Sequence, residues 1–287
     1  NGFTIPRNLF IQQSHGHSKE TTPNMKVIFS QPYGCVINNV HSSAPSTRDS
    51  VSMTLAFHAP ESDENLFKNK SIIEMAKHKG YKTFWIGSQP LKGLYDSKYG
   101  FIAKKSHFTK LTDHKDDELK SILKEVLHDK AKHKFIVIHL WGSHQPYSNF
   151  DEKDKNALPD VDDYDLTIYH TDRVIKSLYD MIEESSKDYV ILYTSDHGEI
   201  VGKGHGFIEG KDQYLIPFMY KSMNRNYDCQ FIESFRNNNG WLSGLMNKFI
   251  LSDLLSYKIK KNILEREKYN DRVLYTNGRP IDFSKIE

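Results

Sequence analysis

Residues 190–206 read VILYTSDHGEIVGKGHG, and this stretch decides how the rest of the chain is interpreted. Its first four residues form a short apolar run that is typical of a fully buried parallel strand. The strand brings Asp196 and His197 to its carboxyl end, where Gly198 permits a tight turn that aims both side chains at one point. That point is a candidate metal site. A helix-capping aspartate beside a loop histidine is the alternative, and a second imidazole at His205, between two glycines, favours the metal.

The composition bounds the class of protein. With 287 residues, of which 38% are hydrophobic and 26% charged, the chain can bury one large core, and we expect a single domain over residues 1–287. The 39 basic and 37 acidic residues nearly cancel, so the charge gives no argument for a nucleic-acid partner. No run approaches the roughly 18 apolar residues of a membrane helix. Because the chain begins at Asn1 without a signal-like apolar segment, we expect any membrane anchor to lie upstream, outside this chain.

The two cysteines leave the cellular compartment open. Cys35 and Cys229 lie far apart in the sequence and lack the CxxC spacing of zinc ribbons. They are therefore either two free thiols or the two halves of one disulfide.

Strand-like and helix-like segments alternate along the chain. Short apolar or aromatic runs predict strands, and apolar residues spaced three and four apart predict helices. This alternation predicts an α/β fold in which helices cover both faces of a mostly parallel sheet, and such sheets bind ligands at the carboxyl ends of their strands. The predicted strands are 27–29, 35–37, 81–86, 135–140, 190–193 and 216–219, and the predicted helices lie within 47–57, 72–76, 119–127, 174–182 and 242–257.

Thr47 is the candidate nucleophile. A cluster of small residues, 41–46, leads into it, and the helical pattern that follows places it near a helix N-terminus. A threonine hydroxyl attacks poorly at neutral pH, but a divalent cation favours its alkoxide, and the helix dipole favours an incoming phosphate. The alternative is an ordinary N-cap, although Ser50 stands where a capping box would have Glu or Gln.

Further histidines fall at the end of another predicted strand. His144 follows the strand 135–140, so it would reach the same edge of the sheet as Asp196 and His197. Carboxylate and imidazole are the ligands that divalent metals use in hydrolytic and transfer enzymes. The alternative for His144 is an ordinary loop residue in a chain with 14 histidines, and a buried structural role is favoured for His139, inside the strand.

Several motifs, taken together and in this order, resemble those of bacterial phosphoethanolamine transferases. Residues 194–199 read TSDHGE, residues 139–147 read HLWGSHQPY and residues 20–23 read ETTP, which are similar to the SDHGE, HxxGSHxxY and TTP motifs of that family. Residues 45–47, PST, resemble the segment that bears the family's threonine nucleophile, and residues 81–86, YKTFWI, resemble one of its strands.

This resemblance implies both a fold and a reaction. The family belongs to the alkaline phosphatase and sulfatase superfamily, which implies an alkaline-phosphatase-like three-layer sandwich. The similarity runs from about residue 19 to residue 220 and is closest to members that modify lipopolysaccharide core sugars. The implied reaction moves phosphoethanolamine from phosphatidylethanolamine to a lipopolysaccharide, on a core sugar or lipid A, or to another surface glycan, through a covalent threonine intermediate. The implied place is the periplasmic face of a bacterial inner membrane, where we expect a monomer that reaches the membrane surface through its absent anchor.

The resemblance also implies roles for individual residues. Thr47 would accept the phosphoethanolamine group and would ligate zinc (Zn2+), in one tight site, together with Asp196 and His197. The other implied site residues would bind the substrate phosphate or a second zinc in the same cavity, or lie close to it. They are His144, His205, Lys92 and His139.

One departure from the family concerns a glutamate ligand. The family places a zinc-binding glutamate in a GES-type segment at the end of its first strand, upstream of the TTP motif, whereas this chain has no carboxylate before Glu20. Either the ligand lies before Asn1, or the residues that bear it are missing from within this sequence, or the site is incomplete, and we prefer the first two alternatives because so many other site residues are present.

Two other functions stay open. A sulfatase or phosphodiesterase of the same superfamily would hydrolyse its substrate, but residues 43–47, SAPST, have Thr47 where the SxPxR segment of sulfatases has arginine. A catalytically dead relative that binds a glycan or a lipid is favoured only by the absent glutamate. Metal analysis would separate such a relative from both enzymes.

Overall fold

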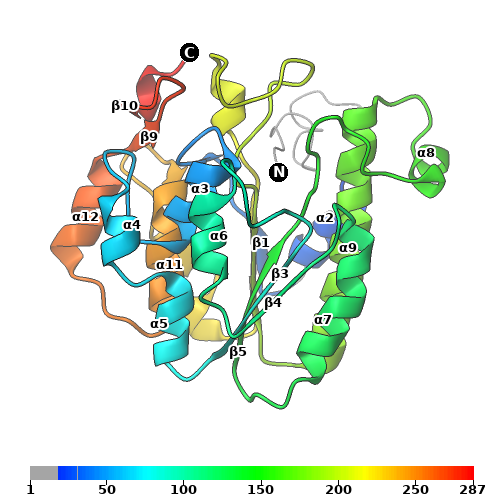
Figure 1. Cartoon of the computed structure of the whole chain (residues 1–287), viewed down its shortest axis with the longest axis horizontal. Helices are drawn as coiled ribbons and strands as arrows, with labels where there is room; N and C mark the ends of the chain where they lie inside the picture. The colour runs from blue at the N-terminus through cyan, green and yellow to red at the C-terminus, as the bar shows by residue number, and fades with distance from the viewer. Residues whose placement is uncertain (1–18, 31) are drawn as a thin grey trace.

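The computed structural model describes residues 19–30 and 32–287, which the coloured ribbon of Figure 1 follows. The strands are β1 (Gly34–Val36), β2 (Val40–His41), β3 (Lys82–Gly87), β4 (Phe108–Leu111), β5 (Lys134–His139), β6 (Val190–Thr194), β7 (Phe218–Ser222), β8 (Leu242–Ser243), β9 (Arg272–Leu274) and β10 (Pro280–Asp282). The helices are α2 (Pro23–Ser30), α3 (Thr47–Leu55), α4 (Glu64–Lys68), α5 (Ile72–His78), α6 (Ser97–Ala103), α7 (Leu119–His128), α8 (Glu152–Ala157), α9 (Asp163–Ser185), α10 (Cys229–Glu233), α11 (Asn247–Leu254) and α12 (Lys261–Tyr269).

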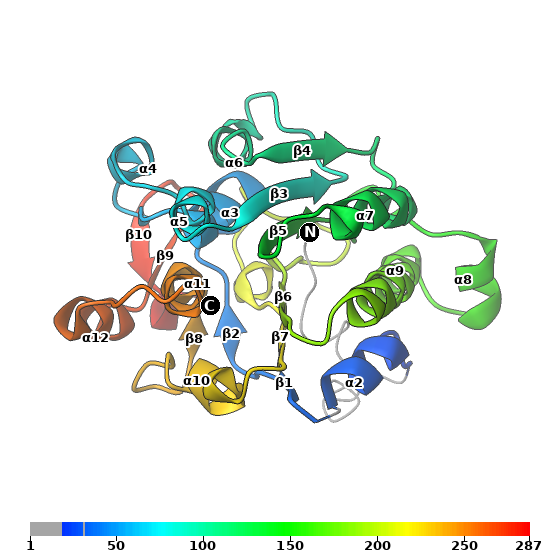
Figure 2. The ribbon, with the colours of Figure 1, turned by 90° about the horizontal axis from the view of Figure 1, so that it is seen from below.

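The strands form a central layer with helices on both sides. Figure 2 shows them crossing the molecule in the order β4, β3, β5, β6, β7 and β1. Helices α3, α5, α6 and α11 lie on one side of this layer, and α2, α7 and α9 lie on the other (Figure 1). The predicted three-layer α/β fold is confirmed.

The strand pairing is parallel in one half of the layer and antiparallel in the other. Strand β3 pairs in parallel with β4 and β5, and β7 pairs antiparallel with β1 and β6. Strands β2 and β8 form a short parallel pair, and β9 and β10 form an antiparallel hairpin. Although β5 and β6 are neighbours in Figure 2, no backbone pairing joins them within the described residues.

The prediction of a buried parallel strand at 190–193 is wrong in two respects. Strand β6 forms there, but its described partner β7 runs antiparallel to it, and its residues are only half-buried or exposed. The physical reason is the connection, because the chain returns from the histidine loop beside the strand it has left, without a long crossover helix.

One predicted strand is a helix. The apolar run 27–29 lies in α2, whose buried residues recur at helical spacing. Pro23 takes the first helical position, where the missing amide hydrogen costs nothing. Asp172 of α9 accepts hydrogen bonds from the amides of Asn24 and Met25 at 3.0 and 2.7 Å, which satisfies two donors at the start of the helix. This tertiary contact outweighs the β preference of the apolar run.

Two apolar cores hold the helices on the central layer. On one side, α3, α5 and α6 pack around the fully buried Trp85 of β3. On the other side, α7 and α9 pack on β3 and β5 around Phe84 and Ile86. Because both cores close on β3, the carboxyl ends of β3 and β5 are held in place. The helix predicted over 242–257 is shorter than expected, since residues 242–243 form β8 beside β2.

Cys35 of β1 and Cys229 of α10 form a disulfide, with their Cα atoms 6.1 Å apart. The sequence leaves open whether these cysteines are free thiols or one disulfide, and the structure has the disulfide. Across residues 19–30 and 32–287, no helix has both the length and the apolar character needed to cross a membrane.

Candidate active site

Thr47 is the first residue of α3. Ser46 holds the N-cap position, with φ −142° and ψ 144°, so Thr47 is not the ordinary N-cap of the alternative interpretation. The Ser46 hydroxyl does not cap the helix but donates to Asp49 Oδ2 at 3.0 Å. Because the first amides of a helix lack partners within it, the start of α3 adds positive potential next to the Thr47 hydroxyl.

The Thr47 hydroxyl meets two residues that follow β6. Its Oγ1 lies 3.3 Å from His197 Nε2, and it also hydrogen bonds to the Asp196 carboxylate. Asp196 Oδ2 and His197 Nε2 are 3.5 Å apart. The turn after His197 requires Gly198, because a Cβ atom there would come within 2.1 Å of the Asp212 carbonyl oxygen. The three side chains predicted as ligands thus converge on one point.

Burial and charge set the protonation of this pair. Burial alone would raise the pKa of the Asp196 carboxyl, but the imidazoles of His197 and His139 and the hydrogen bond from Thr47 hold it well below its usual range. Burial lowers the pKa of His197 to about 4, although the Asp196 charge opposes this. At neutral pH the two groups are therefore a carboxylate and a neutral imidazole, the forms that bind a metal ion.

His205 is oriented by Glu199, to which sequence analysis assigned no role although it stands in the TSDHGE motif. His205 Nδ1 donates to Glu199 Oε2 at 2.7 Å, and the Tyr147 hydroxyl donates to Glu199 Oε1 at 2.7 Å. Burial alone would raise the pKa of Glu199, but the hydrogen bond from His205 and the electrostatic interaction with its ring hold the pKa of Glu199 below its usual range. His197, Glu199 and His205 offer ligand atoms within 4.8 Å of one another, so this side of the site could also hold a metal.

A cavity of about 560 Å³ opens over Thr47. His144 and His205 both line it, and their ring centroids lie 6.0 Å apart. His144 Nδ1 is engaged by the Gln145 carbonyl oxygen at 2.5 Å, which leaves Nε2 of His144 for a ligand. The lining also includes residues 274–278, the turn between β9 and β10, which no sequence motif indicates.

Of the predicted site residues, Asp196 and His197 reach the cavity only through their contact with Thr47, and neither His139 nor Lys92 belongs to its lining among the described residues. His139 ends β5, where both ring nitrogens are buried without a hydrogen-bond partner in the described part of the chain, and burial lowers its pKa to about 4. Its ring packs edge-on against Trp85 and Tyr99, in keeping with the structural role favoured from the sequence. Lys92 is exposed on the loop between β3 and α6, and its contact with a phosphate stays a prediction.

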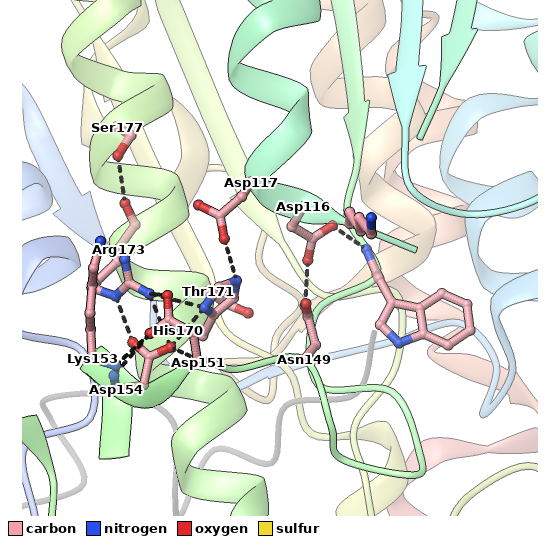
Figure 3. A network of polar contacts seen from close by, with 12 residues as sticks. Asp116, Asp117, Asn149, Asp151, Lys153, Asp154, His170, Thr171, Arg173 and Ser177 are labelled. Carbon is pink, nitrogen blue, oxygen red and sulfur yellow. Dashed lines mark hydrogen bonds and ion pairs between the residues drawn. The ribbon is translucent and has the colours of Figure 1, made fainter. Parts of the chain in front are cut away.

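Asp116 fastens the loops that follow β3 and β5. The residue is 1% exposed, and its carboxylate accepts hydrogen bonds from the Ser88 hydroxyl and from the amides of Trp141 and Gly142. Asn149 Nδ2 donates a fourth bond at 2.8 Å (Figure 3). The sequence gives no signal for this role, because Asp116 stands in an ordinary polar run.

A second group of acidic and histidine side chains is an ion-pair cluster. Asp151, Asp154 and His170 lie close enough to hold a metal. Arg173 occupies their centre, however, with Nε donating to Asp154 Oδ1 at 2.6 Å and Nη2 donating to Asp151 Oδ2 at 3.1 Å (Figure 3). Burial alone would raise the pKa of Asp154, but His170 and Arg173 hold it well below its usual range. The guanidinium already supplies the positive charge, so the cluster fastens α8 to α9.

Comparison with known sequences gives a family and named relatives. The family model for sulfatases matches residues 12–247. Phosphoethanolamine transferase EptC of Escherichia coli (strain K12) is 27% identical over an alignment of 238 residues that covers 71% of this chain and 41% of EptC. Phosphoethanolamine transferase CptA of Salmonella typhimurium is 29% identical, again over 71% of this chain and 41% of the relative. The chain therefore spans about four tenths of the length of these curated relatives.

Comparison with solved structures gives the fold. The C-terminal periplasmic domain of EptC from Escherichia coli, in a complex with Zn, has a TM-score of 0.78 at 21% identity, covering 99% of this chain and 91% of that one. The corresponding domain of EptC from Campylobacter jejuni has a TM-score of 0.71 at 18% identity, covering 91% and 88%. A protein of the alkaline phosphatase superfamily from Vibrio parahaemolyticus has a TM-score of 0.61 at 14% identity, covering 89% and 67%. Because the sulfatase model also matches well over half of its residues, the chain belongs to the sulfatase family.

Proposed function

We propose that this chain is the catalytic domain of a zinc-dependent phosphoethanolamine transferase. The observation that carries the proposal is the contact of Thr47 Oγ1, at the start of α3, with both Asp196 and His197. The names of the relatives support the group that is transferred. The proposed donor is phosphatidylethanolamine, and the proposed acceptor is a hydroxyl group of lipopolysaccharide, on a core sugar or lipid A, or of another surface glycan. The proposed place of action is the periplasmic face of a bacterial inner membrane.

The donor set fits a zinc ion. Deprotonated Asp196, neutral His197 and the hydroxyl of Thr47 offer the oxygen and nitrogen ligands that zinc binds, and the structural neighbour solved with Zn supports this choice of metal. When bound, Zn2+ would favour the alkoxide of the threonine. His144 and His205 are proposed to hold the substrate phosphate, with a second zinc as the alternative. Glu199 keeps His205 Nδ1 engaged, so that Nε2 of this ring faces the ligand.

The proposed reaction has two steps. In the first, the Thr47 hydroxyl gives up its proton as Oγ1 attacks the phosphorus of phosphatidylethanolamine, the bond from phosphorus to the diacylglycerol oxygen breaks, and that oxygen takes up a proton. In the second, an acceptor hydroxyl gives up its proton as its oxygen attacks the same phosphorus, the bond from phosphorus to Thr47 breaks, and Thr47 Oγ1 takes up a proton. Free amides at the start of α3 would stabilise the charge on the phosphate oxygens, and the imidazoles of His144 and His205 would do so through Nε2 in their protonated form.

The proposal is tested by trapping the covalent intermediate. Wild-type protein incubated with labelled donor should gain the mass of phosphoethanolamine on the peptide that contains Thr47. Thr47→Val keeps the shape of the side chain but removes the hydroxyl, so it should stay folded, form no adduct and lose turnover by about a thousandfold or more. Thr47→Ser, which keeps a hydroxyl, is the matched control and should form the adduct. An active Thr47→Val variant would falsify the covalent route.

Metal analysis tests the zinc assignment separately. Purified protein should hold about one equivalent of tightly bound zinc, and Asp196→Asn should lower this content because it removes a charged ligand. Less than about half an equivalent in the wild type would contradict the assignment and would favour the catalytically dead relative. A sulfatase or phosphodiesterase would instead release a free product from the adduct when no acceptor is present.

A further inference from the structure

Two large apolar side chains stand exposed in the lining of the Thr47 cavity, and a third exposed apolar side chain adjoins one of them in the sequence. Leu94 is 72% exposed, Tyr95 is 66% exposed and Phe207 is 85% exposed. Tyr95 and Phe207 belong to the lining of the cavity, and Leu94 is next to Tyr95 in the chain. They come from two segments far apart in the sequence, the loop between β3 and α6 and the loop after β6. We call these three side chains the mouth residues.

The position of the mouth residues distinguishes them from other exposed apolar side chains. Phe67 and Tyr269 are also exposed, at 64% and 85%, but neither lines the cavity. Single exposed apolar residues are common on protein surfaces, whereas a group that surrounds a binding site usually marks a contact surface. The mouth residues therefore indicate a contact surface for a partner that binds at the cavity.

The size of the cavity indicates which partner this is. A volume of about 560 Å³ suits a small ligand, so a phosphate and its headgroup would fit, whereas two long acyl chains would remain outside. We propose that the mouth residues insert into the interfacial region of a phospholipid bilayer while the headgroup of a donor lipid enters the cavity. This inference rests on the proposed function, which takes the donor to be a bilayer lipid. The ring of Tyr95, apolar with a polar hydroxyl, suits a membrane interface.

The charges around the mouth residues favour insertion over electrostatic attraction. Lys92 and Asp96 flank Leu94 and Tyr95, and Lys203 and Glu209 flank Phe207, so the charged residues nearest to the mouth residues in the sequence cancel. A surface without net charge gains little from anionic lipids, and its affinity comes from the apolar area that it buries. Binding to a bilayer should therefore change little with salt, unlike binding through a basic patch.

Flotation of the 287-residue chain with vesicles of phosphatidylcholine and phosphatidylethanolamine tests the inference. Leu94→Ser/Phe207→Ser removes two mouth residues, and the control Phe67→Ser/Tyr269→Ser removes two similarly exposed apolar side chains elsewhere. We expect the wild type and the control to float, and the mouth variant to bind the vesicles about tenfold more weakly or worse, because two apolar side chains no longer leave water. Raising the salt from about 0.05 to 0.5 M should change wild-type binding less than about twofold.

Several results would overturn the inference. The first is a wild type that does not float, and the second is a mouth variant that floats as well as the wild type. The third is a wild-type dimer that does not bind vesicles and that the mouth substitutions dissociate, because this result would assign the surface to a second copy of the chain. Equal melting temperatures exclude unfolding as the cause, and the single variant Phe207→Ser replaces the double one if its melting temperature falls. The Thr47 adduct with a water-soluble short-chain donor tests the proposed function independently. An adduct without flotation overturns only the inference, and flotation without an adduct overturns only the function.

Discussion

At the scale of single residues, the direction of His205 is set by Glu199. When Nδ1 of an imidazole donates to a carboxylate, Nε2 offers a lone pair to a metal ion if the ring is neutral and a proton to a phosphate oxygen if the ring is protonated, so the partner of Nδ1 fixes the direction in which Nε2 points. The carboxylate of Glu199 accepts from Nδ1 at 2.7 Å and is itself held by the Tyr147 hydroxyl. Glu199 is therefore a positioning residue, which acts on a substrate phosphate only through His205.

Replacing Glu199 by Gln should lower turnover by about ten- to a hundredfold, as losses of such outer partners typically do. The amide keeps the size of the side chain, but it cannot accept from both His205 and Tyr147 as the carboxylate does. Steady-state kinetics measure the effect, and zinc content measured on the same samples shows whether metal was lost instead. The matched control is Glu209→Gln on the same loop, whose exposed side chain should be replaceable without effect. Equal turnover of the two variants would contradict the role of Glu199.

The proximity of two site residues is easiest to predict from the sequence when both follow the same strand. Asp196 and His197 are adjacent and follow an apolar run, so their proximity needs only a turn at Gly198. Thr47 lies in a distant segment of the sequence, and only the resemblance to a family predicts that it lies beside Asp196 and His197. The sequence does not indicate the role of Glu199, because this residue acts through His205, six residues away, and no sequence pattern specifies the direction of that ring.

At the scale of elements, the buried carboxylate of Asp116 holds together the loops that follow two different strands, β3 and β5. Asp116 accepts from Ser88 after β3, from Trp141 and Gly142 after β5, and from Asn149 further on. The loop after β5 is the one that carries a predicted phosphate ligand to the cavity. Asp116 therefore links the folding of two strand ends to the geometry of the site.

Asp116→Asn should destabilise the protein by about 2–4 kcal/mol, because hydrogen bonds to a charged acceptor are lost and an amide donor then faces another donor. Turnover should fall as well, since the loop after β5 loses its anchor. The neighbouring Asp117 is a matched control, as its side chain is 44% exposed in its ion pair with Lys120, so Asp117→Asn should cost less than about 1 kcal/mol. Urea unfolding of both variants measures the difference, and similar losses in the two would argue against the anchoring role.

The errors in element prediction have a common cause in long-range contacts. The run 27–29 has β-branched and aromatic residues, yet Asp172 of α9 caps the first turn of α2 and makes a helix favourable. The run 190–193 does form a strand, but the direction of its partner depends on how the chain returns after the histidine loop. Local pattern predicts that an element exists, while its type and its pairing depend on residues far away in the sequence.

At the scale of the whole molecule, the cavity is closed by a segment that lies beyond the part matched by the family model. That model ends at residue 247, whereas the turn between β9 and β10, residues 274–278, forms one wall of the cavity. The hairpin is fixed to the site, because the amide of Leu274 donates to the Ser43 carbonyl at 2.8 Å, just before Thr47. Alternation and motifs could predict the α/β fold and the convergence of Asp196 and His197 on Thr47, but not this wall, since a short polar turn has no sequence signal for its place in space.

The position of this turn leads to a prediction about the two half-reactions. Both proposed steps use Thr47, but only the second needs an acceptor, and an acceptor has to enter between the phosphorylated threonine and the cavity wall. The turn offers groups that suit a sugar, the ring of Tyr275 for stacking and the amide of Asn277 for hydroxyl groups. We therefore expect Tyr275→Ala/Asn277→Ala to slow transfer from the Thr47 adduct to a glycan acceptor more than it slows formation of the adduct, by about tenfold or more, which corresponds to the loss of one or two good contacts.

Rapid mixing followed by mass spectrometry of the Thr47 peptide measures both rates in one experiment. Asn277 Oδ1 also accepts from the amide of Arg279 at 3.0 Å, so part of any effect could come from the shape of the turn. Asn224→Ala removes a similar turn contact, from Asn224 Oδ1 to the amide of Asn226 at 3.0 Å, at a place that does not line the cavity, and it should leave both rates unchanged. Equal slowing of the two steps in the hairpin variant would assign the turn to the donor, whereas slowing of the second step alone would assign this wall to the acceptor.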